Sequence, residues 1–127
     1  MSGAVLDSSA VLALLLNEPG GAFVLASIAG AAISTLNYCE VVTKMIDLGI
    51  EADRAAARVA AFALDVVPFD EAQARRAAIL RATTKRAGLS LGDRACVALA
   101  MARDAPVMTA DKVWASLSLE VPVIVIR

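Results

Sequence analysis

Apolar and polar residues alternate along this chain in blocks that predict strands and helices in regular succession. The segment GAVLD (residues 3–7) has the apolar run of a short buried strand, and VLALLLNE (residues 11–18) predicts a helix capped by Ser8 or Ser9. The PGG run that follows ends this helix. By the same reasoning, strands are expected at 31–35, 64–69, 106–109 and 121–126, and helices at 22–30, 37–48, 51–63, 70–86, 92–103 and 111–117.

This succession predicts the α/β class. Strands that are separated by helices run parallel, so we expect a three-layer α/β/α domain with a central, mainly parallel sheet of about five strands. The 127 residues are enough for one domain with a real core, and we assign residues 1–127 to a single domain. In such sheets the ligand crevice lies beyond the carboxyl ends of the strands.

The composition is 59% hydrophobic but only 4% aromatic, which predicts a core of closely packed Val, Leu, Ile and Ala. The apolar excess also suggests a buried subunit interface. Residues 19–39 carry no charge, but they are too polar and too broken by glycine for a membrane span. Cys39 and Cys96 fall in apolar helical patterns, so we expect buried thiols in a reduced, cytoplasmic protein.

The charged and titratable residues restrict the possible catalytic mechanisms but do not identify a binding partner. The net charge is -1, which gives no general attraction for nucleic acid. The chain contains no histidine, and this excludes histidine general-base nucleases, Ser-His-Asp triads and histidine-ligated zinc sites. If the protein is an enzyme, a mechanism built on carboxylates and a metal ion is one of the few that remain.

Four acids stand at polar breaks beside apolar segments: Asp7 in VLDSSA, Glu40 in STLNYCE, Asp93 in LSLGDRA and Asp111 in VMTADKVW. An acid beside a core is costly unless something binds it. Asp7 ends the first predicted strand and Asp111 follows the fourth, whereas Glu40 and Asp93 lie in first turns of helices, where the dipole favours anions. All four are expected at one sheet edge, as a site for Mg²⁺ or Mn²⁺.

The segments around these acids resemble a known family. VLDSSAVLALLLNE, ISTLNYCEV, LSLGDRACVALA and VMTADKVWA are similar to segments of PIN-domain ribonucleases, in particular VapC-type toxins of bacterial VapBC toxin–antitoxin pairs. The resemblance extends from Val5 to the terminal VIVIR. It implies a PIN-like fold and a Mg²⁺- or Mn²⁺-dependent endoribonuclease that hydrolyses RNA phosphodiester bonds with metal-activated water.

The resemblance also assigns roles by position. It makes the four acids the catalytic and metal-binding residues, with Asp7 and Asp93 as direct ligands and the other two binding directly or through water. It assigns supporting hydrogen bonds to Ser8, Asn37 and Thr109. It further implies a homodimer and a VapB-like antitoxin that covers the site. The five residues after the TAD motif lack the further acid that some relatives carry, which leaves the number of metal ions open.

Each of these acids also has a simpler structural interpretation. Taken alone, Asp7 and Asp111 would more often be helix caps, and Asp93 a first-turn acid on a helix dipole. Glu40 would pair with Lys44, four residues on, for a gain of about 0.3–0.5 kcal/mol. The four acids together, with the resemblance, favour a shared metal site.

For the basic and aromatic residues too, a structural role is weighed against a functional one. The run of five basic residues between 75 and 86 is more often a solvated helix face than a binding surface. Arg94 and Lys112 adjoin site acids, so they are better candidates for contacting substrate phosphate. Trp114, the lone tryptophan, is expected to anchor the core under the last helix.

Three other functions remain in competition. A receiver-like signalling domain also has a parallel sheet and an acidic Mg²⁺ pocket, but it needs paired acids after the first strand, where this chain has Asp7 followed by two serines. A haloacid-dehalogenase-type phosphatase needs a D-x-D motif at the same place. A non-catalytic PIN domain that only binds RNA or a protein partner is the third alternative, and it would not require the four acids.

Overall fold

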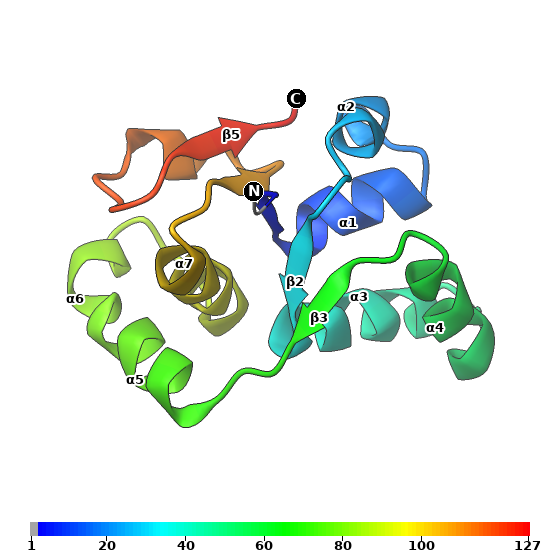
Figure 1. Ribbon diagram of the computed structural model, residues 1–127, viewed down its shortest axis with the longest axis horizontal. Helices are drawn as coiled ribbons and strands as arrows, with labels where there is room; N and C mark the ends of the chain where they lie inside the picture. Colours follow the sequence, from blue (N-terminus) through cyan, green and yellow to red (C-terminus); the bar gives the residue numbers. More distant parts are fainter. Residues whose placement is uncertain (1–2) are drawn as a thin grey trace.

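Five short strands form one parallel sheet at the centre of the computed structural model, which describes residues 3–127 (Figure 1). The strand order is β3-β2-β1-β4-β5, and each pair of neighbours runs parallel. The fold class predicted from the sequence is therefore confirmed. The strands are β1 (Val5–Leu6), β2 (Ala32–Ser34), β3 (Asp65–Val67), β4 (Val107–Thr109) and β5 (Val123–Val125).

Helices connect the strands at nearly all the predicted places. They are α1 (Ser8–Leu15), α2 (Gly21–Ala26), α3 (Thr35–Asp47), α4 (Ala52–Ala60), α5 (Glu71–Ile79), α6 (Arg81–Thr84), α7 (Leu91–Arg103) and a 3₁₀ helix, η1 (Lys112–Ser116). The single helix expected over 70–86 is instead divided at Leu80. The carbonyl oxygen of Leu80 accepts hydrogen bonds from the hydroxyl groups of Thr83 and Thr84, and such bonds bend helices.

Alternation along the strands separates the core into two halves. Successive side chains of a strand point to opposite faces of a sheet. In β1, Val5 belongs to the hydrophobic cluster on the α7 side, whereas Leu6 belongs to the cluster formed with α1 and α3. Val107 and Met108 in β4 divide in the same way. This period of two gives the three layers seen in Figure 1, with α5, α6 and α7 on one side of the sheet and α1, α3 and α4 on the other.

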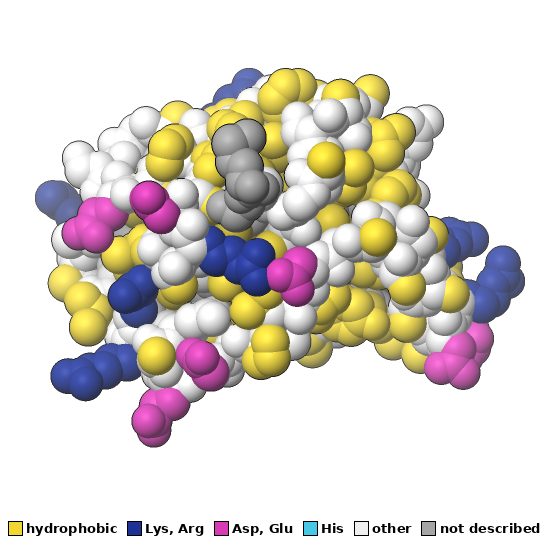
Figure 2. All heavy atoms as spheres, in the orientation of Figure 1, with side chains coloured by type: hydrophobic (Ala, Val, Ile, Leu, Met, Phe, Trp, Pro, Cys, Tyr) yellow, Lys and Arg dark blue, Asp and Glu magenta, His cyan; other side chains and the backbone are white. Residues whose placement is uncertain are grey.

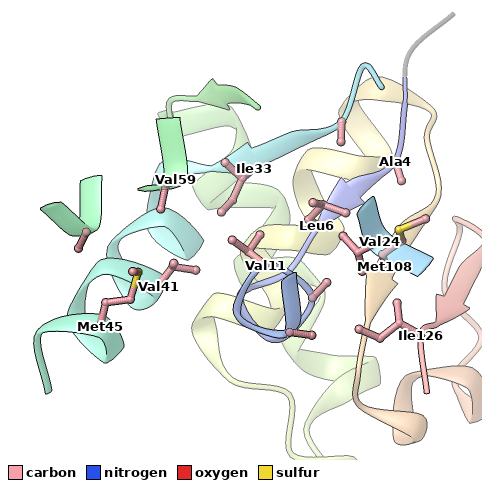
Figure 3. Close-up of a cluster of buried hydrophobic side chains, with 14 residues drawn as sticks. Ala4, Leu6, Val11, Val24, Ile33, Val41, Met45, Val59, Met108 and Ile126 are labelled. Carbon is pink, nitrogen blue, oxygen red and sulfur yellow. The ribbon is translucent and has the colours of Figure 1, made fainter. Parts of the chain in front are cut away.

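The larger cluster lies under α1, α3 and α4, as Figure 3 shows. Leu6, Ile33 and Met108 from three neighbouring strands meet Val11 of α1 and Val41 of α3 there, and all five are buried. On the other face, α7 supplies Cys96, Val97, Leu99 and Ala100. Trp114 is fully buried in this second cluster, so its predicted role as a core anchor is confirmed.

Charged side chains gather on several parts of the surface (Figure 2). In Figure 2, dark blue and magenta side chains gather over the side occupied by α5 and α6 and again around α4. Within residues 3–127, no helix has both the length and the apolar character needed to cross a membrane.

The connection order creates a switch point beside β1. The chain moves from β1 outward to β2 and β3, and then crosses back to β4 and β5 on the other side. In open α/β sheets the ligand crevice opens beyond the carboxyl ends of the strands at this reversal. Asp7 directly follows β1, and Asp111 comes two residues after β4. Two of the predicted site acids therefore lie on either side of the switch point.

Candidate active site at the switch point

Asp7 is a buried carboxylate that is held by three hydrogen bonds. Its side chain is only 3% exposed. Oδ1 accepts hydrogen bonds from the Ser9 hydroxyl at 2.7 Å and from the backbone N–H of Ala10 at 2.9 Å. Oδ2 accepts one from the Thr109 hydroxyl at 2.6 Å. Asp7 is thus the N-cap of α1, a role that we had expected for Ser8 or Ser9.

The surroundings of Asp7 oppose its negative charge. Burial raises the pKa of this carboxyl from 3.8 to about 6, although the hydrogen bonds from Thr109, Ser9 and Ala10 lower it. The negative charge of Asp93 adds to the rise in pKa. A group whose pKa is raised by burial and by a neighbouring like charge is typical of a functional site.

Thr109 and Ser9 connect Asp7 to the loop that carries Asp111. The Thr109 hydroxyl oxygen accepts from the backbone N–H of Asp111 at 3.0 Å while it donates to Asp7. The Ser9 hydroxyl oxygen accepts from the backbone N–H of Ala110 at 2.9 Å. The supporting hydrogen bond that we predicted for Ser8 is made by Ser9 instead, because α1 begins at Ser8 and its second residue faces back toward the cap.

Glu40 lies against the first turn of α7. Its Oε1 accepts a hydrogen bond of 2.9 Å from the side-chain amide of Asn37. The same amide group donates to the backbone carbonyl of Gly92, also at 2.9 Å. Asn37 therefore ties α3 to α7. The predicted pair between Glu40 and Lys44 is not among the ion pairs of residues 3–127.

Asp93 belongs to a capping box at the start of α7. Its Oδ2 accepts from the backbone N–H of Ser90 at 2.9 Å, and its own N–H donates to the Ser90 hydroxyl at 3.2 Å. The expected start of this helix near Gly92 is confirmed, with Leu91 as its first residue. Asp111 similarly caps η1 through Oδ1, which accepts from the N–H of Val113 at 3.0 Å.

The thiol of Cys96 indicates how close the acids are to one another. It is completely buried one turn after Asp93. Burial raises its pKa well above the ordinary value, and the charges of Asp7, Asp93 and Glu40 raise it further. The charges of three acids that are far apart in the sequence are therefore all felt at this buried thiol. Asp111 is joined to them through Thr109 and Asp7.

These residues offer the oxygen ligands that a hard divalent cation prefers. Asn37 is 1% exposed and its Oδ1 atom has no hydrogen-bond partner, so it is a further oxygen available at this place. Within residues 3–127, however, no group of three Asp, Glu, Cys or His side chains lies close enough to hold a metal ion. Glu40, Asp93 and Asp111 each accept a hydrogen bond from a protein donor. The oxygen atoms of these residues suit a divalent cation, but each carboxylate is positioned by its own protein hydrogen bonds.

Other predicted contacts differ from the structure. The guanidinium of Arg94 donates to the backbone carbonyl of Ala77 in α5 at 2.9 Å, so it turns away from the acids and its predicted phosphate contact is not supported. Lys112 is exposed beside Asp111, as a phosphate ligand needs to be. Cys96 is buried as expected, but Cys39 is exposed.

A surface hollow of about 700 Å³, away from the four site acids, is lined by residues of α5, among them Glu71, Arg75, Arg76 and Ile79. Arg75 and Arg76 belong to the basic run, and Glu71 shares this hollow with them, so acids and bases are mixed on the helix.

The strand order and the position of the acids separate this fold from that of receiver domains. The molecule is an open, doubly wound parallel sheet with acids at its switch point, and the order 3-2-1-4-5 differs from the 2-1-3-4-5 order of receiver domains. The receiver alternative is thereby excluded. The sequence model of the PIN domain family matches residues 4–118, and the chain therefore belongs to the PIN domain family. No curated protein matches the chain in sequence.

Solved structures share the fold at low sequence identity. A toxin–antitoxin complex from Klebsiella pneumoniae superposes with a TM-score of 0.77 at 20% identity, over 98% of both chains. DNA-bound VapBC from Salmonella typhimurium has a TM-score of 0.76 at 19% identity, again over 98% of both chains. VapBC-5 from Mycobacterium tuberculosis has a TM-score of 0.59 at 23% identity, over 100% of this chain and 99% of the other.

Proposed function

We propose that this protein is a Mg²⁺- or Mn²⁺-dependent endoribonuclease of the VapC type, the toxin of a toxin–antitoxin pair. The observation that carries this proposal is that Glu40 rests against Gly92, directly before Asp93, while Asp7 follows β1 at the switch point and is affected by the charge of Asp93. The resemblance of the four acidic motifs to VapC sequences points to RNA as the substrate. The structural similarity to complexes described as VapBC gives independent support.

The four acids would hold the cation, with Asp7 and Asp93 as direct ligands. When bound, a divalent cation neutralises charge on the phosphodiester and makes water a better nucleophile. The water oxygen would give up a proton to a carboxylate or to solvent as it attacks phosphorus, the bond from phosphorus to the leaving oxygen would break, and the leaving oxygen would take up a proton. The chain lacks histidine, so carboxylates and water must supply the proton transfers.

The hydrogen bonds around the acids determine what each one contributes. Asp7 is fixed by Ser9, Ala10 and Thr109, so its orientation is set before any cation arrives. Glu40 is exposed, and among residues 3–127 its carboxylate accepts one hydrogen bond, from Asn37, so it can turn toward a ligand or a proton. Lys112 is exposed next to Asp111 and is the better residue to attract substrate phosphate.

The expected partners follow from the same proposal. A cognate VapB-like antitoxin would cover the acidic edge, and a homodimer would bury part of the apolar surface, which includes Ile79 at 67% exposure. A cytoplasmic location fits the two free cysteines of residues 3–127, Cys39 and Cys96.

Cleavage of labelled total RNA tests the activity. The purified protein is incubated with Mg²⁺ or Mn²⁺, or with EDTA, beside Asp93→Asn prepared identically. Asparagine keeps an oxygen that can accept from the N–H of Ser90, so the capping box is retained while the charge is lost. Asp104→Asn is the matched control, because Asp104 is an exposed residue at the opposite end of α7. Its φ of 51° is a conformation that asparagine tolerates well.

The expected result is discrete fragments that require metal, persist in Asp104→Asn and disappear in Asp93→Asn. Fragments that persist in Asp93→Asn would reveal a contaminating nuclease or a site that does not use this acid. If no preparation cleaves RNA but the wild type binds it, the remaining alternative applies, a PIN domain that binds RNA or a partner without catalysis.

A further inference from the structure

Residue 92 occupies a position where a side chain would collide with a predicted metal ligand. Gly92 is buried in the first turn of α7, directly before Asp93. A Cβ atom built on Gly92 would lie 2.5 Å from Cδ of Glu40 and would overlap both carboxylate oxygens. The Glu40 carboxylate thus rests directly on the Cα of residue 92, in space that exists only because glycine has no side chain.

We propose that Gly92 is a positioning residue, whose missing side chain keeps the Glu40 carboxylate on the first turn of α7 beside Asp93. The inference rests on the proposed metal-dependent function of Glu40. Two contacts support it besides the overlap. Asn37 donates to Glu40 and to the Gly92 carbonyl at once, so the carboxylate is drawn toward this residue. The N-terminus of a helix also favours an anion placed against it.

The backbone conformation does not explain a glycine at this position. Positive φ angles are found at four other glycines, Gly20, Gly30, Gly49 and Gly88, whereas residue 92 is part of a regular helix. Alanine forms helices better than glycine does, so helix propensity favours replacing this residue. The contact with Glu40 is the feature of the structure that requires a glycine.

The colliding atoms determine what a substitution would do. Glu40 is exposed and its carboxylate is the end of a flexible side chain, so it can rotate into solvent when a methyl group is added at residue 92. Gly92→Ala should therefore keep the fold but displace Glu40. Loss of an outer contact that orients a ligand typically lowers metal affinity or activity on the order of 10- to 100-fold.

A double-mutant cycle between residues 92 and 40 tests the inference without any need for catalysis. Wild type, Gly92→Ala, Glu40→Ala and the double variant are unfolded by urea in EDTA. Gly92→Ala should raise the urea midpoint clearly more in the Glu40→Ala background than in the wild type, because only the wild type has a carboxylate to displace. Equal changes in the two backgrounds would overturn the inference.

Binding of Mn²⁺, measured by calorimetry on the same four proteins, completes the test. Gly92→Ala should weaken binding on the order of 10-fold or more in the wild type and leave it unchanged in the Glu40→Ala background. Leu91→Ala, an exposed change in the same turn, is the control and should have no effect. If Glu40→Ala itself leaves Mn²⁺ binding unchanged, the ligand role of Glu40 is wrong. If Glu40→Ala weakens Mn²⁺ binding but Gly92→Ala does not, the proposed role of Gly92 is wrong and the proposed function stands.

Discussion

Replacing Asp7 by asparagine removes the charge of the buried carboxyl but nearly preserves its shape. In the folded protein burial raises the pKa of Asp7 to about 6, from 3.8 for an unperturbed aspartate. Between pH 4 and pH 6, therefore, the folded state holds a proton that the unfolded chain has released. Above pH 6 the folded state must carry a buried negative charge, and a pKa raised from 3.8 to about 6 corresponds to about 3 kcal/mol lost from the free energy of unfolding.

Asp7→Asn should therefore be more stable than the wild type at pH 7.5, by about 1–3 kcal/mol in the absence of metal. Below pH 4 both side chains are neutral, and the difference should vanish. The gain in unfolding free energy should be smaller than the full cost of the buried charge, because hydrogen bonds around residue 7 must rearrange. Asparagine Oδ1 can still accept from Ser9 and Ala10, but its amide would donate to Thr109, whose hydroxyl must then turn its own hydrogen elsewhere.

Urea unfolding in EDTA at pH 4, 5, 6 and 7.5, followed by circular dichroism, measures the effect. The quantity to compare is the difference in unfolding free energy between wild type and variant, because other groups that titrate cancel in it. Asp104→Asn, an exposed change far along α7 from Asp93, is the control variant. The reasoning is refuted if the advantage of Asp7→Asn does not depend on pH, or if it grows as the pH falls.

Four further predictions concern metal binding and residues around the site acids. Millimolar Mn²⁺ should raise the melting temperature of the wild type by mass action and raise that of Asp7→Asn less, as differential scanning fluorimetry can measure. Thr109→Val removes a hydrogen bond from a buried carboxylate, so it should lower the unfolding free energy at pH 7.5 by about 1–3 kcal/mol in urea titrations. Arg94→Leu should lower the melting temperature but leave RNA cleavage intact, because the Arg94 guanidinium bonds to the backbone of Ala77. Lys112→Ala should weaken RNA binding in filter assays and leave the melting temperature unchanged.

The layers of this fold can be predicted from the sequence because they follow from period and order. Neighbouring residues such as Val5 and Leu6 point to opposite faces of the sheet once they are part of a strand. Strands that are connected by helices run parallel. The acids could be found for a similar reason. Asp7 and Asp111 stand where apolar runs end, and the ends of parallel strands lie at one edge of the sheet.

The details of the site depend on geometry that no local pattern contains. Whether Ser8 or Ser9 contacts Asp7 depends on the residue at which α1 begins, since one residue rotates a helical side chain by about 100°. The contact of Glu40 with Gly92 joins residues 52 positions apart, and the crossing of α3 and α7 decides it. Arg94 was expected near phosphate because it adjoins Asp93, but neighbours in a helix point in different directions.

A helix cap and a proposed metal ligand are compatible roles for these acids. Asp7, Asp93 and Asp111 each accept from backbone N–H groups at the start of α1, α7 and η1, and Glu40 lies against the first turn of α7. Helix N-termini stabilise anions, so each carboxylate has a positive partner of its own before any cation binds. The acids can therefore stand near one another in a metal-free protein despite their mutual repulsion. It follows that EDTA should abolish metal-dependent activity without unfolding the chain, and unfolding of the wild type by EDTA alone, seen by circular dichroism at pH 7.5, would contradict this account.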